Sequence, residues 1–304
     1  MKTRSVFRAL AFVAAAVLAT STIFAADKST KHVLFFNKSS GFEHSAIKHA
    51  PGELAASEKV LKELGEKHNI EFTFTKDGTM FTPENLKKFD CFMFYTTGDL
   101  TTVGTDGNPA MSKEAKAMFL DAIKGGKGFV GVHSATDTFH SPGNDKHSPA
   151  RYKDDGDNAD PYIKMIGAEF IKHGQQQPGH LICVDKKFPG LSDFPADFAP
   201  VEEWYSLKDF APNMHVLLVQ DTSKMHGKIY ERPNYPSTWA HMYGKGRVFY
   251  TNMGHREDVW TNEVFQKVLM GGFDWTLRRA NANVKPNIKK VTPKADVMPP
   301  MDNQ

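Results

Sequence analysis

The residues best suited to chemistry lie in short polar clusters beside apolar runs that are typical of buried strands. The clearest case is Phe129 to Val132, which is apolar on successive residues and stops on His133 and Ser134. In an open α/β sheet, ligands bind at the carboxyl ends of such strands, although His133 could instead only cap a turn. The candidate site residues are His44, His133, Ser134, Asp137, Glu203, Tyr205, Trp239, His241, His255 and Arg256.

Three histidines and one glutamate, His44, His133, His255 and Glu203, are expected to meet if the loops after the strands converge on one crevice. Three imidazoles and a carboxylate suit a divalent metal with an open coordination position. They suit general acid–base catalysis equally well, because histidine titrates near neutral pH and its surroundings tune a glutamate. No short ligand motif such as HExxH is present, and 13 histidines make chance clusters common, so both interpretations stay open.

Aromatic residues in the same region offer a third interpretation, a carbohydrate-binding module. Trp204, Tyr205, Trp239 and Trp260 could stack on sugar faces while Asp, Asn and Arg bind hydroxyls. Trp239 and His241 share one face of a predicted strand, because residues two apart point the same way. For any single aromatic residue, a place in the core is the more common outcome.

Residues 1–26 have the pattern of an export signal. Lys2, Arg4 and Arg8 precede an apolar run, and small residues before Asp27 offer a cleavage point. We therefore expect a secreted or periplasmic protein with no membrane span, since no later run approaches the ~20 apolar residues that a span needs. The net charge of +3 falls near zero without this leader, so nothing suggests a nucleic-acid surface.

The remaining chain alternates strands and helices and then becomes strand-rich. The predicted strands are 32–37, 70–74, 91–95 and 129–132, then 180–185, 202–206, 215–220 and a hairpin of 237–243 with 247–252. Helices are predicted from Ile47 to Leu64, with a kink or restart at Pro51-Gly52, after the caps Thr82 and Ser112, and over 263–279. This order predicts a doubly wound, flavodoxin-like, mostly parallel sheet in one domain, residues 27–280, followed by a flexible tail, 281–304.

The loop after His133-Ser134 and the two cysteines carry further information. The polar stretch 139–160 follows His133-Ser134 directly and is expected to form a lid or rim, with His140 and His147 as solvated loop histidines. Cys91 and Cys183 lie in apolar runs typical of core strands, and two positions alone do not establish a disulfide.

Several ordered motifs run from about residue 32 to residue 278. They are Gly41 to Ile47, Thr96 to Asp99, Gly128 to His133, Glu203 to Tyr205, Trp239 to Val248 and Tyr250 to His255. Together they resemble the ThuA-like family, the trehalose-utilisation domain of the class I glutamine amidotransferase-like superfamily.

Glutamine amidotransferases place a nucleophilic Cys after the strand that corresponds to 129–132. This chain has Val132-His133-Ser134 there, which argues against thiol-based glutamine hydrolysis. Ser134 does not indicate a hydrolase, because neighbours on a turn rarely face each other and only Asp137 is near enough to orient the histidine.

The resemblance implies a role in the use of trehalose or other disaccharides, in pathways where a dehydrogenase first oxidises the sugar to a 3-keto form. Such a substrate calls for proton abstraction beside a carbonyl, in an isomerase, lyase or hydrolase. In that hypothesis His133 is the base or a metal ligand with Glu203 as its partner, and His44 and His255 polarise the carbonyl or bind metal. Tyr205, Trp239 and Arg256 then position the sugar. The alternative is a non-catalytic carbohydrate-binding or accessory domain.

The chain departs from the family pattern at two positions. Glu43 precedes His44 where the family often has Arg, and Gly174 follows His173 where the family often has Pro. Either change could alter ligand choice at the rim of the site.

Overall fold

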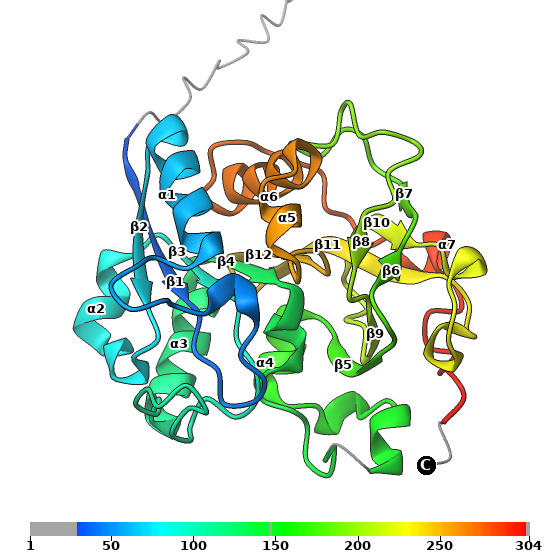
Figure 1. Ribbon diagram of the computed structural model, residues 1–304, viewed down its shortest axis with the longest axis horizontal. Helices are drawn as coiled ribbons and strands as arrows, with labels where there is room; N and C mark the ends of the chain where they lie inside the picture. Colours follow the sequence, from blue (N-terminus) through cyan, green and yellow to red (C-terminus); the bar gives the residue numbers. More distant parts are fainter. Residues whose placement is uncertain (1–28, 146–147, 302–304) are drawn as a thin grey trace, which may run out of the picture.

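An eight-stranded sheet organises the computed structural model, which describes residues 29–145 and 148–301 (Figure 1). Its order is β2-β1-β3-β4-β12-β11-β10-β7, parallel from β2 to β12 and antiparallel from β12 to β7. This confirms a mostly parallel α/β sheet with a strand-rich second half. The strands are β1 Lys31–Phe36, β2 Ile70–Thr75, β3 Cys91–Phe94, β4 Gly128–Val132, β7 Leu181–Cys183, β10 His215–Gln220, β11 Tyr235–Tyr243 and β12 Gly246–Thr251.

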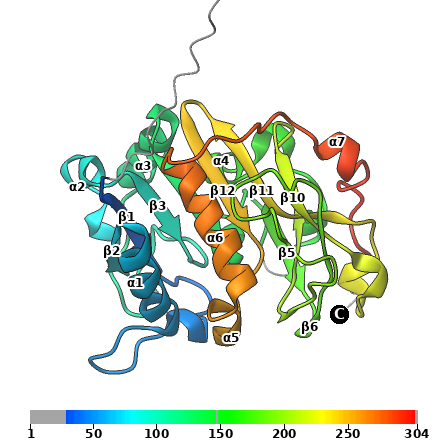
Figure 2. The same cartoon turned by 90° about the horizontal axis from the view of Figure 1, so that it is seen from above.

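Helices cover both faces of this sheet (Figure 2). Val33 and Phe35 of β1 pack with α1 and α6, whereas Leu34 and Phe36 pack on the opposite face with α2, α3 and α4. Successive residues of a central strand are therefore all buried, which explains the continuous apolar runs. The helices are α1 Ala56–His68, α2 Pro83–Lys88, α3 Lys113–Gly125, α4 Pro161–Ile166, α5 Glu257–Trp260, α6 Glu263–Thr276 and α7 Ile288–Val291.

The helix boundaries follow local chemistry. The hydroxyls of Thr82 and Ser112 accept hydrogen bonds from the backbone N–H groups of Asn85 and Ala115 at the starts of α2 and α3, as predicted. The helix expected from Ile47 begins only at Ala56. Ser45–Ile47 form a single 3₁₀ turn, and the Pro51-Gly52 turn, with Gly52 at φ +76°, separates it from α1.

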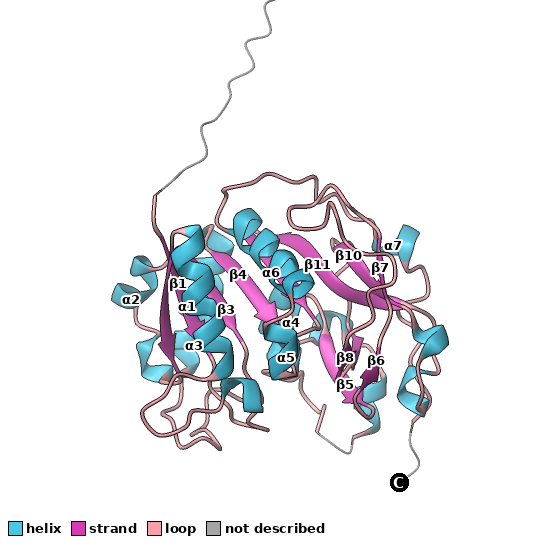
Figure 3. Cartoon of the chain, turned by 45° about the horizontal axis from the view of Figure 1, so that its top comes forward, coloured by secondary structure: helices cyan, strands magenta, loops and turns pink. Residues whose placement is uncertain are grey.

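Two small sheets stand beside the carboxyl end of the main sheet (Figure 3). β5 (Glu169–His173) pairs with β9 (Tyr205–Lys208), and β6 (Gln177–Pro178) pairs with β8 (Val201–Glu202). The strand predicted over 202–206 is thus two strands from different sheets. Glu203 and Trp204 lie in the break between them, and this break places Glu203 in the site.

The segment beyond Ala280, expected to be a flexible tail, packs on the sheet over its described residues 281–301. Asn287 pairs with the backbone of Val216 in β10 in both directions, at 2.6 and 3.0 Å, and Ile288 and Ala295 are buried. A side-chain amide carries the same donor and acceptor as a peptide group, so Asn287 extends the pairing that β10 makes.

Three further predictions concern the cysteines, the export signal and a membrane span. Cys91 and Cys183 are both free. The export signal, residues 1–26, lies outside the described range. Among residues 29–145 and 148–301, no helix combines the length and apolar character needed to cross a membrane.

Candidate functional site

The site begins where β4 ends. His133 follows Val132 with φ +44°, a left-handed conformation that is rare for a residue with a side chain, and starts the 3₁₀ turn His133–Asp137. Strain of this kind gathers at functional sites. The ring of His133 is completely buried, and its Nδ1 lies 3.2 Å from the carbonyl oxygen of Asn252, which follows the neighbouring strand β12. A carbonyl only accepts, so Nδ1 carries the hydrogen and Nε2 offers a lone pair to the interior of the site.

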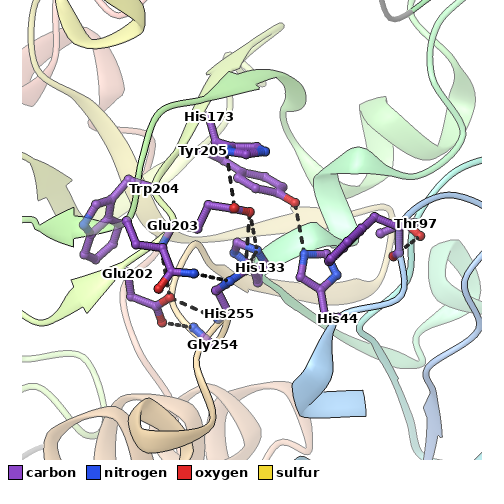
Figure 4. A network of polar contacts seen from close by, with 12 residues as sticks. His44, Thr97, His133, His173, Glu202, Glu203, Trp204, Tyr205, Gly254 and His255 are labelled. Carbon is purple, nitrogen blue, oxygen red and sulfur yellow. Dashed lines mark hydrogen bonds and ion pairs between the residues drawn. The ribbon is translucent and has the colours of Figure 1, made fainter. Parts of the chain in front are cut away.

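Around that nitrogen the structure brings together all four residues of the predicted cluster (Figure 4). His255 Nδ1 lies 3.2 Å from His133 Nε2 and 3.3 Å from Glu203 Oε2. The distance between His133 Nε2 and Glu203 Oε2 is 3.8 Å. His44 stands edge-on to both histidines, with ring centroids 4.9 and 5.1 Å away. One donor atom from each of the four residues lies within 4.8 Å of the others.

Burial sets the charge of this cluster. Loss of solvation lowers the pKa of His133 to about 4 and holds that of His44 well below its usual range, so both imidazoles are neutral at pH 7. For Glu203, burial favours the protonated form, but hydrogen bonds to His133 and His255 outweigh it and hold its pKa below the ordinary range. At neutral pH, the cluster therefore offers the neutral imidazoles of His133 and His44 beside the carboxylate of Glu203.

The cluster opens on a cleft of about 1200 Å³ whose wall includes His44, Glu203 and Tyr205. Tyr205 packs its ring 4.2 Å from that of His133, and its hydroxyl lies 3.5 Å from His44 Nε2. Phe42, with 68% of its surface exposed, stands at the same wall with its ring edge-on to His44. The cleft is large enough for a sugar of more than one ring, and His133 lies behind its surface.

Three residues that contribute to the site were not among the predicted site residues. His173, at the end of β5, lines the cleft and places Nδ1 3.3 Å from Glu203 Oε1. Gln176 contacts the outer nitrogen of His255, with Nε2 2.9 Å from His255 Nε2. Glu202 accepts hydrogen bonds from the backbone N–H groups of Gly254 (2.6 Å) and His255 (3.2 Å) and so fixes the turn that presents His255. Burial raises the pKa of Glu202 to about 8.

The outer wall of the cleft comes from the polar stretch after Asp137, as the lid-or-rim prediction expected. His140 is not a solvated histidine there. Its Nε2 lies 2.7 Å from Asp137 Oδ1, and its Nδ1 lies 2.8 Å from the buried carboxylate of Glu169. Burial opposes protonation, but the two carboxylates outweigh it and raise the pKa of His140. His147 lies outside the described residues.

A second carboxylate group, Asp155, Glu169 and Asp209, lies behind this wall. The buried ammonium group of Lys208 forms ion pairs with two of these carboxylates, at 2.5 Å from Asp155 and 3.4 Å from Asp209. We interpret this group as structural.

The other predicted site residues lie outside the cluster. Trp239 is buried against Tyr250 and donates its indole N–H to the carbonyl of Ile166 at 2.9 Å, so it belongs to the core. His241 does share the face of Trp239, near Gly167, but that face is buried and the imidazole has no hydrogen-bond partner. Trp204 and Trp260 are buried too.

The remaining candidates lie near the cluster without joining it. The hydroxyl of Ser134 is buried and has no hydrogen-bond partner. Asp137 lines the cleft but pairs with His140. Arg256 is bound by Asp258 at 2.9 Å and reaches the cluster only through Gln176, whose Oε1 lies 3.0 Å from its Nη1.

The two departures from the family pattern have local explanations. Glu43 pairs with Lys76 at 2.6 Å, away from the cluster. Gly174 donates its backbone N–H to the hydroxyl of Tyr230 at 2.9 Å, and a Cβ at this position would lie 2.7 Å from the Tyr230 ring. Proline has no N–H and would meet that ring, so glycine suits this position.

The chain is similar to one protein family and to several solved structures. The family profile described as "ThuA: Trehalose utilisation" matches residues 32–276. Among solved structures, a protein described as ThuA-like from Bacteroides uniformis ATCC 8492 aligns with a TM-score of 0.59 and 19% identity, over 84% of this chain and 94% of that one. Another from Parabacteroides merdae ATCC 43184 gives 0.54 and 18%, over 84% and 92%. No curated protein matches the chain significantly.

Proposed function

Because this chain belongs to the ThuA, trehalose-utilisation family, we propose that it binds a sugar oxidised to a ketone and catalyses proton transfer beside the carbonyl. The observation that carries the proposal is the convergence of His44, Glu203 and His173 on the wall of one cleft. A ketone acidifies the hydrogens on the neighbouring carbons, and their removal needs a base for the proton and an electrophile for the oxygen that becomes negative.

His173 is best placed to move the proton. Its ring reaches the cleft, and its Nδ1 lies 3.3 Å from Glu203 Oε1, which orients the imidazole. Its Nε2 is then the nitrogen that takes the proton from the carbon beside the ketone. His133, proposed above as a base, lies behind the cleft surface and instead acts on the substrate through Glu203 and His255.

The carbonyl oxygen would lie against the cluster of His44, His133, Glu203 and His255, on the side that His44 presents to the cleft. Tyr205 and Phe42 flank this position with aromatic surface suited to a sugar ring. Isomerisation, elimination of a glycosidic oxygen and hydrolysis can all start from this one proton transfer. The substrate would come from an oxidoreductase that converts a ring hydroxyl to the ketone.

Exchange with deuterated water tests the proton transfer whatever step follows. A 3-keto-glucoside is incubated with the protein in D₂O, and loss of the hydrogen beside the ketone is followed by NMR. We expect exchange with the wild type and with His226→Gln, an exposed histidine outside the cleft, and a loss of at least ~100-fold with His173→Gln. Binding without exchange would overturn catalysis in favour of a carbohydrate-binding domain, and absence of both would overturn the proposal.

We also propose that the protein is exported, on the pattern of residues 1–26. Cell fractionation followed by amino-terminal sequencing tests this. A mature chain that starts at Asp27 in the periplasm or medium supports export, and an intact chain that keeps Met1 in the cytoplasm contradicts it.

A further inference from the structure

We propose that His44, His133, Glu203 and His255 together bind one divalent first-row transition-metal ion at the floor of the cleft. The role of the ion in catalysis rests on the proposed function. The binding of the ion at this site does not depend on that function.

The spacing of the donor atoms is the first argument. Nitrogen and oxygen ligands held about 2.0–2.2 Å from one ion in a tetrahedron lie roughly 3.3–3.6 Å apart. His133 Nε2, His255 Nδ1 and Glu203 Oε2 are separated by 3.2, 3.3 and 3.8 Å. Charge-assisted hydrogen bonds between the same groups would be about 2.7–2.9 Å long. The three atoms therefore lie farther apart than short charge-assisted hydrogen bonds would place them, and close to the spacing of ligands of a shared ion.

His44 supplies the fourth donor. The residue is buried, its Nδ1 has no hydrogen-bond partner among the residues that the structure describes, and its Nε2 is 3.5 Å from the hydroxyl of Tyr205. A buried imidazole without a good hydrogen bond is costly, and a bound ion would satisfy it. Its donor atom lies within 4.8 Å of the other three, so a small inward movement completes the set.

Outer partners hold the ligands in the required state. The carbonyl of Asn252 keeps the hydrogen of His133 on Nδ1, and this leaves Nε2 as the ligand atom. The amide of Gln176 lies 2.9 Å from the outer nitrogen of His255 and restrains the orientation of that ring. Glu202 fixes the backbone that presents His255.

The ligand set also indicates the kind of ion. Imidazole favours zinc, copper, nickel or iron over magnesium, calcium and manganese, which prefer oxygen donors. Because His44 and Glu203 face the cleft, a fifth coordination position, gained when the four-ligand site expands, would point toward a bound sugar. The ion would there act as the electrophile that holds the carbonyl oxygen while His173 moves the proton.

Cobalt binding tests the site directly. The mature, untagged protein is stripped with a chelator and titrated with Co²⁺ alone, and the stoichiometry and the visible ligand-field absorption are recorded. We expect about one Co²⁺ per chain, displaced by Zn²⁺, with the wild type and with the surface control His226→Gln. Glu203→Gln and His255→Ala should each weaken binding by at least ~100-fold, and Gln176→Leu, which leaves all four donors in place, by about tenfold.

Circular dichroism of each variant establishes that it is folded. Because Glu203 and His255 lie in different segments of the chain, one ligand variant remains informative if the other fails to fold. Absence of cobalt binding by the wild type, or equal binding by the wild type and both ligand variants, would overturn the metal site. Deuterium exchange into the keto-sugar, measured with and without Co²⁺, separates the two proposals. Exchange that survives metal removal supports the proposed function and rules out the role of the ion in it. Cobalt binding without sugar exchange supports the metal site and rules out the proposed function.

Discussion

Two groups of histidines and carboxylates face the same cleft, and they differ in how closely their atoms meet. Around His140, the distances to Asp137 and Glu169 are 2.7 and 2.8 Å, and Glu169 also accepts a hydrogen bond from the Ser141 hydroxyl. Around His133, the corresponding distances to His255 and Glu203 are 3.2 and 3.8 Å.

The difference separates structural from functional chemistry. Both ring nitrogens of His140 and both carboxylate oxygens of Glu169 have close partners, so the group fixes the loop that forms the outer wall of the cleft. The His133 group combines a strained backbone, an imidazole nitrogen without a partner and donors spaced around a common point. Residue type alone would not distinguish the two groups, because both consist of histidine and acid.

The sharpest test of the comparison substitutes one glutamate in each group. Glu203→Gln removes the charge shared by His133, His173 and His255, and we expect proton exchange in a keto-sugar to fall by ~10³-fold or more. NMR in D₂O measures the rate, with the exposed Glu231→Gln as the matched control. Retention of more than a tenth of the wild-type rate would mean that Glu203 does not belong to the catalytic group.

The opposite effect is expected at Glu169. This carboxylate is fully buried and accepts hydrogen bonds from His140, Ser141 and Asn144, so Glu169→Gln disrupts several buried contacts at once. We expect the free energy of unfolding to fall by about 3 kcal/mol, measured by urea denaturation, while the Co²⁺ stoichiometry is unchanged. If stability is unchanged and cobalt binding is lost instead, the assignment of the two groups is reversed.

His241 sharpens the comparison as a histidine that belongs to neither group. Burial lowers its folded-state pKa to about 4, whereas an unfolded histidine titrates near 6.5. As the pH falls through this window the unfolded chain gains a proton that the folded chain does not, so stability is lost, by up to about 3 kcal/mol below pH 4. Urea denaturation at several pH values should show a shallower loss for His241→Leu than for the wild type. Parallel curves would contradict the assignment of a buried, neutral His241.

The smallest effect is expected at the rim. Phe42 is largely exposed beside His44, and it offers a sugar ring a stacking surface without contacting the proton that moves. Phe42→Ala should raise KM for a keto-glycoside about tenfold and leave kcat within about twofold. The exposed Val103→Ala serves as the control. A fall in kcat at constant KM would instead place Phe42 among the groups that act on the reacting atoms.

Much of the fold follows from local patterns in the sequence. Continuous apolar runs predict β1, β3 and β4, because a central parallel strand is buried on both faces. The rule that loops at the carboxyl ends of parallel strands share one edge also places His44, His133 and His255 together. These inferences need only the strand order, which alternation of strands and helices restricts strongly.

The rest depends on contacts that no local pattern encodes. Period-two alternation correctly puts Trp239 and His241 on one face, but it does not reveal that α4 covers that face. Which of two adjacent glutamates enters the site depends on where β8 ends, and His173 is positioned by a pairing between β5 and β9 that joins distant segments. Asn287, likewise, has no pattern that predicts its pairing with β10.

The hydrogen bond from Gly174 to Tyr230 has a consequence for the divergence of related sequences. The Tyr230 hydroxyl accepts from Gly174 and donates to the carbonyl of Trp204 at 2.7 Å, beside Glu203. In a relative with proline at position 174, the backbone N–H that donates to the tyrosine is absent and the proline ring would clash with the tyrosine ring. We therefore expect positions 174 and 230 to vary together. In such relatives the altered contact at Tyr230 would be transmitted to the Glu203 segment, and with it the outline of the cleft would change.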